Sequence, residues 1–187
     1  MKKLLLFLTT ISVLYGFQYD AKFYVGIGGG MQNESLVDDK YLKDDTNSPA
    51  FGSIKFGYGD IKAYSIEILL NYVANQTNVF SADDGSRYGL DVAVIKAFNF
   101  TDIAYPYIRG GFGAGEMSVK DIQSDDKLSF SSFNIGTGAY IPLTESIDME
   151  ISYEYRFTSY ESIYFNEEEI RPQSHINQLY LGVNYRY

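Results

Sequence analysis

The 187-residue sequence contains no cysteine, no tryptophan and a single histidine. Without cysteine it can form no disulfide, no cysteine-ligated zinc or iron–sulfur site, no thiol nucleophile and no lipidated N-terminal cysteine. One histidine also excludes any metal site that needs several imidazoles. Positive charge is scarce, because 15 Lys and Arg face 24 Asp and Glu for a net charge of −9. A nucleic-acid binder needs clustered Lys and Arg, so we expect no nucleic-acid partner, and we expect no metal and no cofactor.

Long apolar runs are scarce, and the mean hydropathy of −0.17 is too polar for a helical membrane bundle. The one run, Leu4 to Leu14, follows the basic pair Lys2 and Lys3 and precedes a small Gly16. Such a layout is typical of a cleaved secretory signal peptide, and so short a run cannot cross a bilayer as a helix, which takes about 20 residues. We therefore expect a signal peptide over residues 1–16 and an exported domain over 17–187. The alternative is an N-terminal membrane anchor.

The sequence after residue 16 is rich in Tyr, Phe and Gly, and its apolar and polar residues alternate. In Ile147–Phe157, Met149, Ile151 and Tyr153 alternate with Asp148, Glu150 and Ser152. A period of two residues indicates β-strands. Eight segments show it: Lys22–Gln32, Ala50–Tyr58, Ala63–Tyr72, Tyr88–Ala97, Tyr107–Gly115, Phe130–Ile141, Ile147–Phe157 and Gln178–Tyr187. An even number of strands of about ten residues each is what an antiparallel membrane barrel requires.

The connections between these segments are short and long in turn. The short ones are Gly59–Lys62, Asn99–Ile103 and Pro142–Ser146, and the long ones are Asn33–Pro49, Ala74–Ser86, Met117–Leu128 and Thr158–Ser174. Outer-membrane barrels have short periplasmic turns and long extracellular loops. The sequence thus predicts an all-β fold, an eight-stranded antiparallel transmembrane β-barrel with four long extracellular loops.

Alternation alone does not say which face points outward, and an exported soluble barrel of lipocalin type would place the apolar face inside. The interior of eight strands is too narrow for so many large apolar side chains. Glycines also share the polar face, where inward side chains crowd: Gly26, Gly28, Gly30, Gly111, Gly113, Gly115, Gly136, Gly138 and Gly182. Turning the strands over would expose charges to lipid, which for Arg costs about 2–4 kcal/mol at the midplane. We therefore place the polar face in the lumen.

The lumen is then predicted to hold a cluster of charged side chains. Its members are Glu67, Asp91, Arg109, Glu150, Glu154 and Arg156, with Lys55 and Arg186 as further candidates. Charges in a narrow, low-dielectric interior must pair, and we expect Arg109 to pair with Glu67 or Asp91. Two interpretations follow: a static polar plug, or a gated ion path whose pairs exchange partners.

Three stretches carry a resemblance to a known family: PYIRGGFGAG at Pro106–Gly115, IPLTESIDMEISYEYRF at Ile141–Phe157 and LYLGVNYRY at the C-terminus. With the signal peptide, they resemble the small bacterial outer-membrane β-barrel superfamily of OmpA-type, OmpX/Ail-type and opacity-type barrels. This resemblance implies a location in the outer membrane, among lipid and lipopolysaccharide. It also implies a C-terminal signal for the barrel-assembly machinery: Leu179, Leu181, Val183, Tyr185 and Tyr187.

The long loops carry most of the negative charge. Glu34 is placed in the first of these loops. An acidic outer rim is predicted from Asp38, Asp39, Asp44, Asp45, Asp83, Asp84, Asp125, Asp126, Glu167, Glu168 and Glu169. These acids are either ordinary solvated loop residues or a surface for a partner. The partners that suit them are divalent cations shared with lipopolysaccharide phosphates, or a basic host or phage ligand. No spacing matches an EF-hand calcium loop.

Many aromatic residues lie near the predicted strand ends, where they would form girdles at the membrane interfaces. They are Phe23, Tyr24, Tyr58, Tyr64, Tyr72, Tyr88, Phe98, Phe100, Tyr105, Tyr153, Tyr155, Tyr185 and Tyr187.

Catalysis has little support in the sequence. Ser174 and His175 are adjacent, so a strand places them on opposite faces, and no acid follows them. We expect a non-enzymatic outer-membrane protein with a structural or surface-interaction role, in adhesion or envelope integrity. The alternatives are a narrow porin-like channel or small-solute transporter and, more remotely, a lipid A-modifying enzyme.

Overall fold

The computed structural model describes residues 20–36, 48–74, 85–119, 127–165 and 168–187. The predicted signal peptide and most of the predicted acidic rim lie outside these ranges. Ten strands are found there: β1 (Lys22–Leu36), β2 (Ala50–Gly59), β3 (Tyr64–Val73), β4 (Arg87–Ala97), β5 (Tyr105–Ser118), β6 (Lys127–Pro142), β7 (Ile147–Tyr160), β8 (Ile163–Phe165), β9 (Glu168–Ile170) and β10 (Gln173–Arg186). No helix in the described part of the chain is long and apolar enough to cross a membrane.

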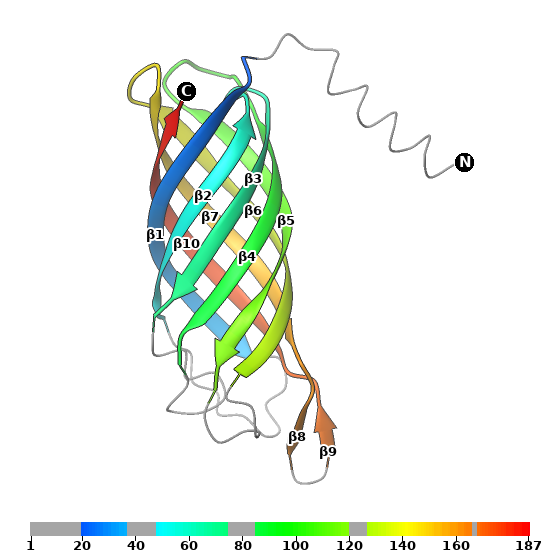
Figure 1. Cartoon of the computed structure of the whole chain (residues 1–187). Helices are drawn as coiled ribbons and strands as arrows, with labels where there is room; N and C mark the ends of the chain where they lie inside the picture. Colours follow the sequence, from blue (N-terminus) through cyan, green and yellow to red (C-terminus); the bar gives the residue numbers. More distant parts are fainter. Residues whose placement is uncertain (1–19, 37–47, 75–84, 120–126, 166–167) are drawn as a thin grey trace, which may run out of the picture.

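Eight of these strands form one closed antiparallel barrel in the order β1-β10-β7-β6-β5-β4-β3-β2 (Figure 1). Each barrel strand pairs with the next barrel strand along the sequence, so that β7 pairs with β10, and β1 closes the barrel against β10, with Tyr24 opposite Arg186 and Leu36 opposite Ser174. The strands β8 and β9 form a separate hairpin beyond the end of the barrel that is opposite the C-terminus. The predicted fold, with all eight predicted strands, is confirmed.

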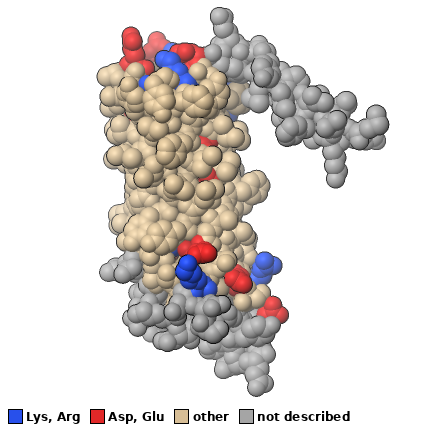
Figure 2. Space-filling view, in the orientation of Figure 1, with Lys and Arg blue, Asp and Glu red and all other residues tan. Residues whose placement is uncertain are grey.

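Burial alternates along every barrel strand, as the sequence pattern requires. Apolar side chains of the odd positions of β1 point outward, where Ile27 is 68% exposed, and on β5 Phe112 is 70% exposed. Figure 2 shows the result: the middle of the visible surface is mostly free of charge, and charged side chains gather toward the two ends. The polar face lies inside the barrel, as predicted.

Glycines make room for large rings in the lumen. A Cβ on Gly138 would lie 2.7 Å from Cζ of Tyr107, and a Cβ on Gly57 would overlap the ring of Tyr24. The narrow interior of an eight-stranded barrel therefore accepts tyrosines because the opposing positions carry no side chain.

Several strands extend further toward the loop end than predicted. β1 continues to Leu36, β5 to Ser118, and β10 begins at Gln173. These extensions lie outside the apolar stretches because their outward side chains are polar, so the hydrophobic pattern fades while the hydrogen-bonded ladder continues. β8 and β9 lie inside the predicted loop Thr158–Ser174 and were not predicted.

Candidate functional site

All eight charged residues predicted for the lumen are buried inside the barrel. Glu67, Asp91, Glu150 and Lys55 are completely buried, and Arg109, Glu154, Arg156 and Arg186 are nearly so. Glu34, Arg87 and Asp148 join them, which the sequence-based set did not include. The described lumen thus contains six acids and five bases, arranged as contacting groups at successive levels of the barrel.

The first group, near mid-barrel, is centred on Lys55 of β2. Its ammonium contacts the carboxylate of Glu150 on β7 and lies 3.7 Å from Oε1 of Glu67 on β3. Tyr107 donates a hydrogen bond of 2.6 Å to Oε1 of Glu150. The ammonium of Lys55 therefore interacts with two carboxylates, and tyrosine hydroxyls donate further hydrogen bonds to the same carboxylates.

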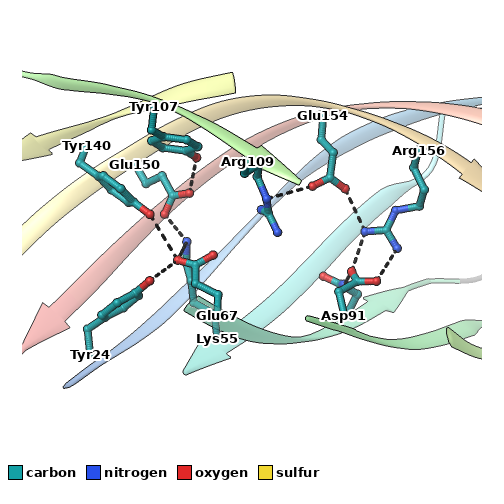
Figure 3. Close-up of polar contacts among 11 residues, drawn as sticks. Tyr24, Lys55, Glu67, Asp91, Tyr107, Arg109, Tyr140, Glu150, Glu154 and Arg156 are labelled. Carbon is teal, nitrogen blue, oxygen red and sulfur yellow. Dashed lines mark hydrogen bonds and ion pairs between the residues drawn. The ribbon is translucent and has the colours of Figure 1, made fainter. Parts of the chain in front are cut away.

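Glu67 illustrates this supply of hydroxyl donors. The hydroxyl of Tyr24 donates to Oε1 of Glu67 at 2.6 Å, and that of Tyr140 donates to the same atom at 3.3 Å (Figure 3). The rings of Tyr24 and Tyr140 both lie in the lumen.

The prediction of interfacial girdles is wrong for Tyr24 and Tyr105, which are 1% and 4% exposed. Tyr24 lies two residues from the inward Gly26 on β1, and Tyr105 lies four residues from the inward Arg109 on β5. The alternation along each strand therefore directs both side chains into the lumen, although both residues lie near strand ends.

The second group joins Arg109, Glu154, Arg156 and Asp91. Arg156 binds Asp91 through two hydrogen bonds, of 3.0 and 2.6 Å, and donates a third of 2.9 Å to Oε1 of Glu154. The Nε atom of Arg109 lies 3.3 Å from Oε2 of Glu154. The amide of Asn71 also donates to Asp91.

The expected pairing of Arg109 with Glu67 or Asp91 is therefore wrong, because its ion-pair partner is Glu154. The register explains this choice. Arg109 lies opposite Gly136 of β6, which in turn lies opposite Glu154 of β7. Since Gly136 has no side chain, Arg109 reaches over it, and a Cβ there would lie 3.3 Å from Cγ of Arg109.

The third group lies toward the loop end and was missed by the sequence reasoning. The carboxylate of Glu34 accepts hydrogen bonds from Arg87 at 2.8 Å and from both Tyr160 and Ser174 at 2.6 Å. Arg87 also donates to Gln32 at 3.0 Å. Glu34 was assigned to the acidic loops, and this is corrected: it is 4% exposed, in β1. Glu34 lies two residues after the inward Gln32, so the alternation along the strand could have predicted that its side chain points into the lumen.

A fourth group closes the end of the barrel where the short connections lie. Arg186 donates to Asp148 through Nε at 2.6 Å, and Asn184 donates to Asp148 at 2.6 Å and to Glu150 at 3.2 Å. The guanidinium of Arg186 stacks on Tyr24, 4.3 Å from the ring centroid. A cavity of about 460 Å³ opens at this end, and Arg186 and Asp148 are among the residues that line it.

Among the residues that the structure describes, large buried side chains occupy most of the interior beyond that cavity. A small pocket of about 20 Å³ lies beside Arg109 and Tyr180, and another of about 10 Å³ lies beside Arg87 and Phe130. A void needs about 10–15 Å³ to hold one water molecule. A cluster of buried apolar side chains packs near the loop end: Met117, Val119, Leu128, Phe130 and Tyr160.

The remaining predicted sites lie on the outside of the barrel. Leu179, Leu181, Val183, Tyr185 and Tyr187, the predicted assembly signal, all point outward and are 47–62% exposed. Of the predicted acidic rim, Glu168 and Glu169 lie in β9, where Glu169 is exposed, and the other members lie outside the described residues.

Ser174 and His175 point to opposite faces of β10, as the sequence predicted. Ser174 is completely buried and donates to Glu34, whereas His175 is partly exposed and contacts the hydroxyl of Tyr155 on the outer surface. The ring of His175 also lies 5.6 Å from that of Phe157. A serine and a histidine on opposite sides of the barrel wall cannot form a catalytic pair.

Comparisons with known proteins agree with this architecture. Residues 4–187 match the family described as outer membrane protein beta-barrel domain. Among solved structures, the chain is similar to Neisserial surface protein A, NspA, with a TM-score of 0.63 and 18% identity over 89% of this chain and 99% of that one. Ail of Yersinia pestis, in complex with the heparin analogue sucrose octasulfate, gives 0.55 and 16% over 89% and 99%. OprG of Pseudomonas aeruginosa gives 0.51 and 14% over 89% and 96%.

Among curated proteins, none matches the sequence. The low identities to the solved structures establish the fold alone, whereas the family match covers nearly the whole chain. Together with the closed barrel and its apolar outer surface, the match places the protein in the bacterial outer membrane. The chain belongs to the outer membrane protein β-barrel family.

Proposed function

We propose that this protein is a non-enzymatic surface protein, which acts in adhesion or envelope integrity through its acidic extracellular loops. The observation that carries the proposal is the filled lumen. Ion pairs and buried rings occupy it at successive levels, from Asp148 and Arg186 at one end to Glu34 and Arg87 at the other. A barrel plugged in this way offers its partners the loops and the outer wall rather than a passage.

The charge of the loops suggests the chemistry of the partner. The predicted rim is acidic, and the described hairpin β8–β9 adds Glu168 and Glu169 at the loop end. Ail has been crystallised with a sulfated, polyanionic ligand. Such a ligand would be repelled by an acidic rim, so we favour the opposite charge here: a divalent cation bridging to lipopolysaccharide phosphates, or a basic ligand of host or phage.

Calcium titration of the full protein in lipopolysaccharide-containing vesicles tests the cation. We expect calcium to slow proteolysis of the loops, and we expect Asp38, Asp39, Asp44 and Asp45 changed together to Asn to weaken this protection. A matched control changes Asp60 and Glu145, acids in the short connections at the other end, to amides. Loop digestion that calcium leaves unchanged, in the wild-type protein, would exclude the cation. Retained binding of a basic peptide would then point to the second partner.

The alternative, a narrow channel or small-solute transporter, needs a continuous water path through the lumen. The ion pairs and the apolar cluster near the loop end oppose it. Planar-bilayer conductance of the wild-type protein and of Arg109→Ala decides between plug and channel, and discrete openings in the wild type would favour the channel. Lipid modification is opposed by the opposite orientations of Ser174 and His175, and acyl analysis of lipid A with and without the protein tests it.

A further inference from the structure

The outer wall of the barrel carries one charge that no other described group of the protein balances. At the outward positions of the eight barrel strands, the charged residues are Lys96, Glu116 and Lys127. Glu116 and Lys127 pair with each other at 3.0 Å near the loop end. Lys96 lies toward the opposite end, as the last residue but one of β4, and it forms no ion pair with the described part of the chain.

Aromatic rings hold the ammonium of Lys96. Its Nζ atom lies 4.0 Å from the ring centroid of Tyr64, the residue opposite it on β3, and 5.8 Å from the ring centroid of Phe98. A cation within about 6 Å of a ring centroid is attracted to the face of the ring. An ammonium also has three N–H donors, and that of Lys96 reaches no oxygen acceptor among the described residues. The rings therefore position the ammonium but leave it without a hydrogen-bond acceptor.

The place of Lys96 on β4 puts its ammonium at the level of the lipid headgroups. The outward residues before it, Val92 and Val94, are apolar and 41% and 58% exposed, as expected of side chains in contact with acyl chains. The connection after β4 exposes Phe100 at 75% and Ile103 at 79%. A lysine at the edge of such an apolar surface lays its stem along the surface and extends its ammonium toward the headgroups.

The charge of Lys96 selects among the acceptors found at this level. Water and lipid phosphates both offer oxygen atoms there, but the phosphate also supplies the missing negative charge. A zwitterionic headgroup already carries a cation that competes for its phosphate, whereas the headgroup of phosphatidylglycerol carries none. Each lysine near an anionic membrane surface contributes about 1 kcal/mol to binding. Charge complementarity therefore favours an anionic phospholipid as the occupant.

We propose that Lys96, held by the rings of Tyr64 and Phe98, binds the phosphate of an anionic phospholipid in the leaflet at the end of the short connections. The exposed Phe100 enlarges the apolar surface beside this site, because its ring stacks on that of Phe98. The inference goes beyond the surface role proposed above. It concerns the other end of the barrel, and it holds whether or not the loops bind a partner.

A single introduced tryptophan can test the site, because the chain contains none of its own. The Phe100→Trp reporter lies beside the site, where the rings of Phe98 and Phe100 are 5.6 Å apart. The Tyr185→Trp reporter lies at the same end of the barrel on β10, four strands away. In phosphatidylcholine vesicles, quenching by brominated phosphatidylglycerol is compared with quenching by brominated phosphatidylcholine. We expect a roughly fivefold preference for phosphatidylglycerol at the first reporter, the factor that matches one lysine, and none at the second.

Charge variants in the Phe100→Trp background test the role of Lys96 itself. Lys96→Gln should abolish the preference, and Lys96→Arg should retain it. The matched control Lys127→Gln removes the same charge near the loop end and should leave the preference intact. A preference that survives Lys96→Gln would overturn the proposal. So would equal quenching by the two lipids at the Phe100→Trp reporter, or equal preference at both reporters, and these two results do not depend on whether the Lys96 variants fold.

Discussion

Removing the carboxylate of Glu34 should destabilise the barrel strongly. In the native protein this carboxylate accepts three hydrogen bonds, from Arg87, Tyr160 and Ser174, and the side chains of Glu34 and Arg87 are 3% and 6% exposed. Glu34→Leu leaves the guanidinium of Arg87 buried without its counter-charge. Breaking a buried ion pair from one side costs about 3–5 kcal/mol. We expect a loss of that size in the free energy of unfolding, measured by urea unfolding in lipid vesicles with circular dichroism as the probe.

The double variant Glu34→Leu with Arg87→Leu separates the unpaired charge from lost packing. Replacing both partners of a buried pair by apolar residues is often neutral or stabilising, so most of the loss should be recovered. Glu116→Leu is the surface control, since Glu116 and Lys127 form a pair of 3.0 Å with side chains 57% and 69% exposed. An exposed pair contributes about 0–1 kcal/mol. A single-variant loss no larger than that of Glu116→Leu would refute the reasoning, as would a double variant less stable than either single one.

Two further changes test the lumen and the outer wall. Gly113→Ala should prevent normal assembly, because its Cβ would overlap a carboxylate oxygen of Asp91, whereas Gly110→Ala on the same strand, with its nearest neighbour 3.9 Å away, should fold normally. The yield of folded barrel on refolding into vesicles compares them, and equal yields would contradict the crowding argument. Val92→Arg, on the outer face of β4, should lower stability by about 2–4 kcal/mol, and Phe100→Arg beyond the strand end by about 0–1 kcal/mol, by vesicle unfolding. Equal losses would mean that the outer face is not in contact with lipid.

The fold was predictable because residues along each strand of a membrane barrel alternate between the lipid face and the lumen face, and the sequence shows this alternation directly. Apolar residues such as Ile151 and Val183 face lipid along the full width of the bilayer, so each strand repeats the same signal. Strand ends were less predictable. Beyond the lipid both faces become polar, and nothing in the composition separates the last pairs of β1 from a loop.

The sequence predicted which charged residues lie in the lumen, but it did not predict which of them contact one another. Inward parity places Glu67, Asp91 and Arg109 in the lumen, and it would have placed Tyr24 and Glu34 there had it been applied without exception. The partner of Arg109 depends on how far neighbouring strands are staggered, and the alternation of a single strand carries no information about stagger. The register across Gly136 was therefore needed to identify Glu154.

The pairing of β1 with β10 has a consequence for how the chain recognises its correct alignment. Sliding the last strand by two residues keeps every apolar side chain on the lipid face, so hydrophobicity does not distinguish this register from the correct one. The contacts of the buried polar groups do distinguish the two registers. A slip of β10 against β1 would separate Gln178 from Gln32 and Ser174 from Glu34, and would leave polar groups without partners in the core. These side-chain contacts form only when the first and last strands meet, so they favour the correct alignment of the final seam.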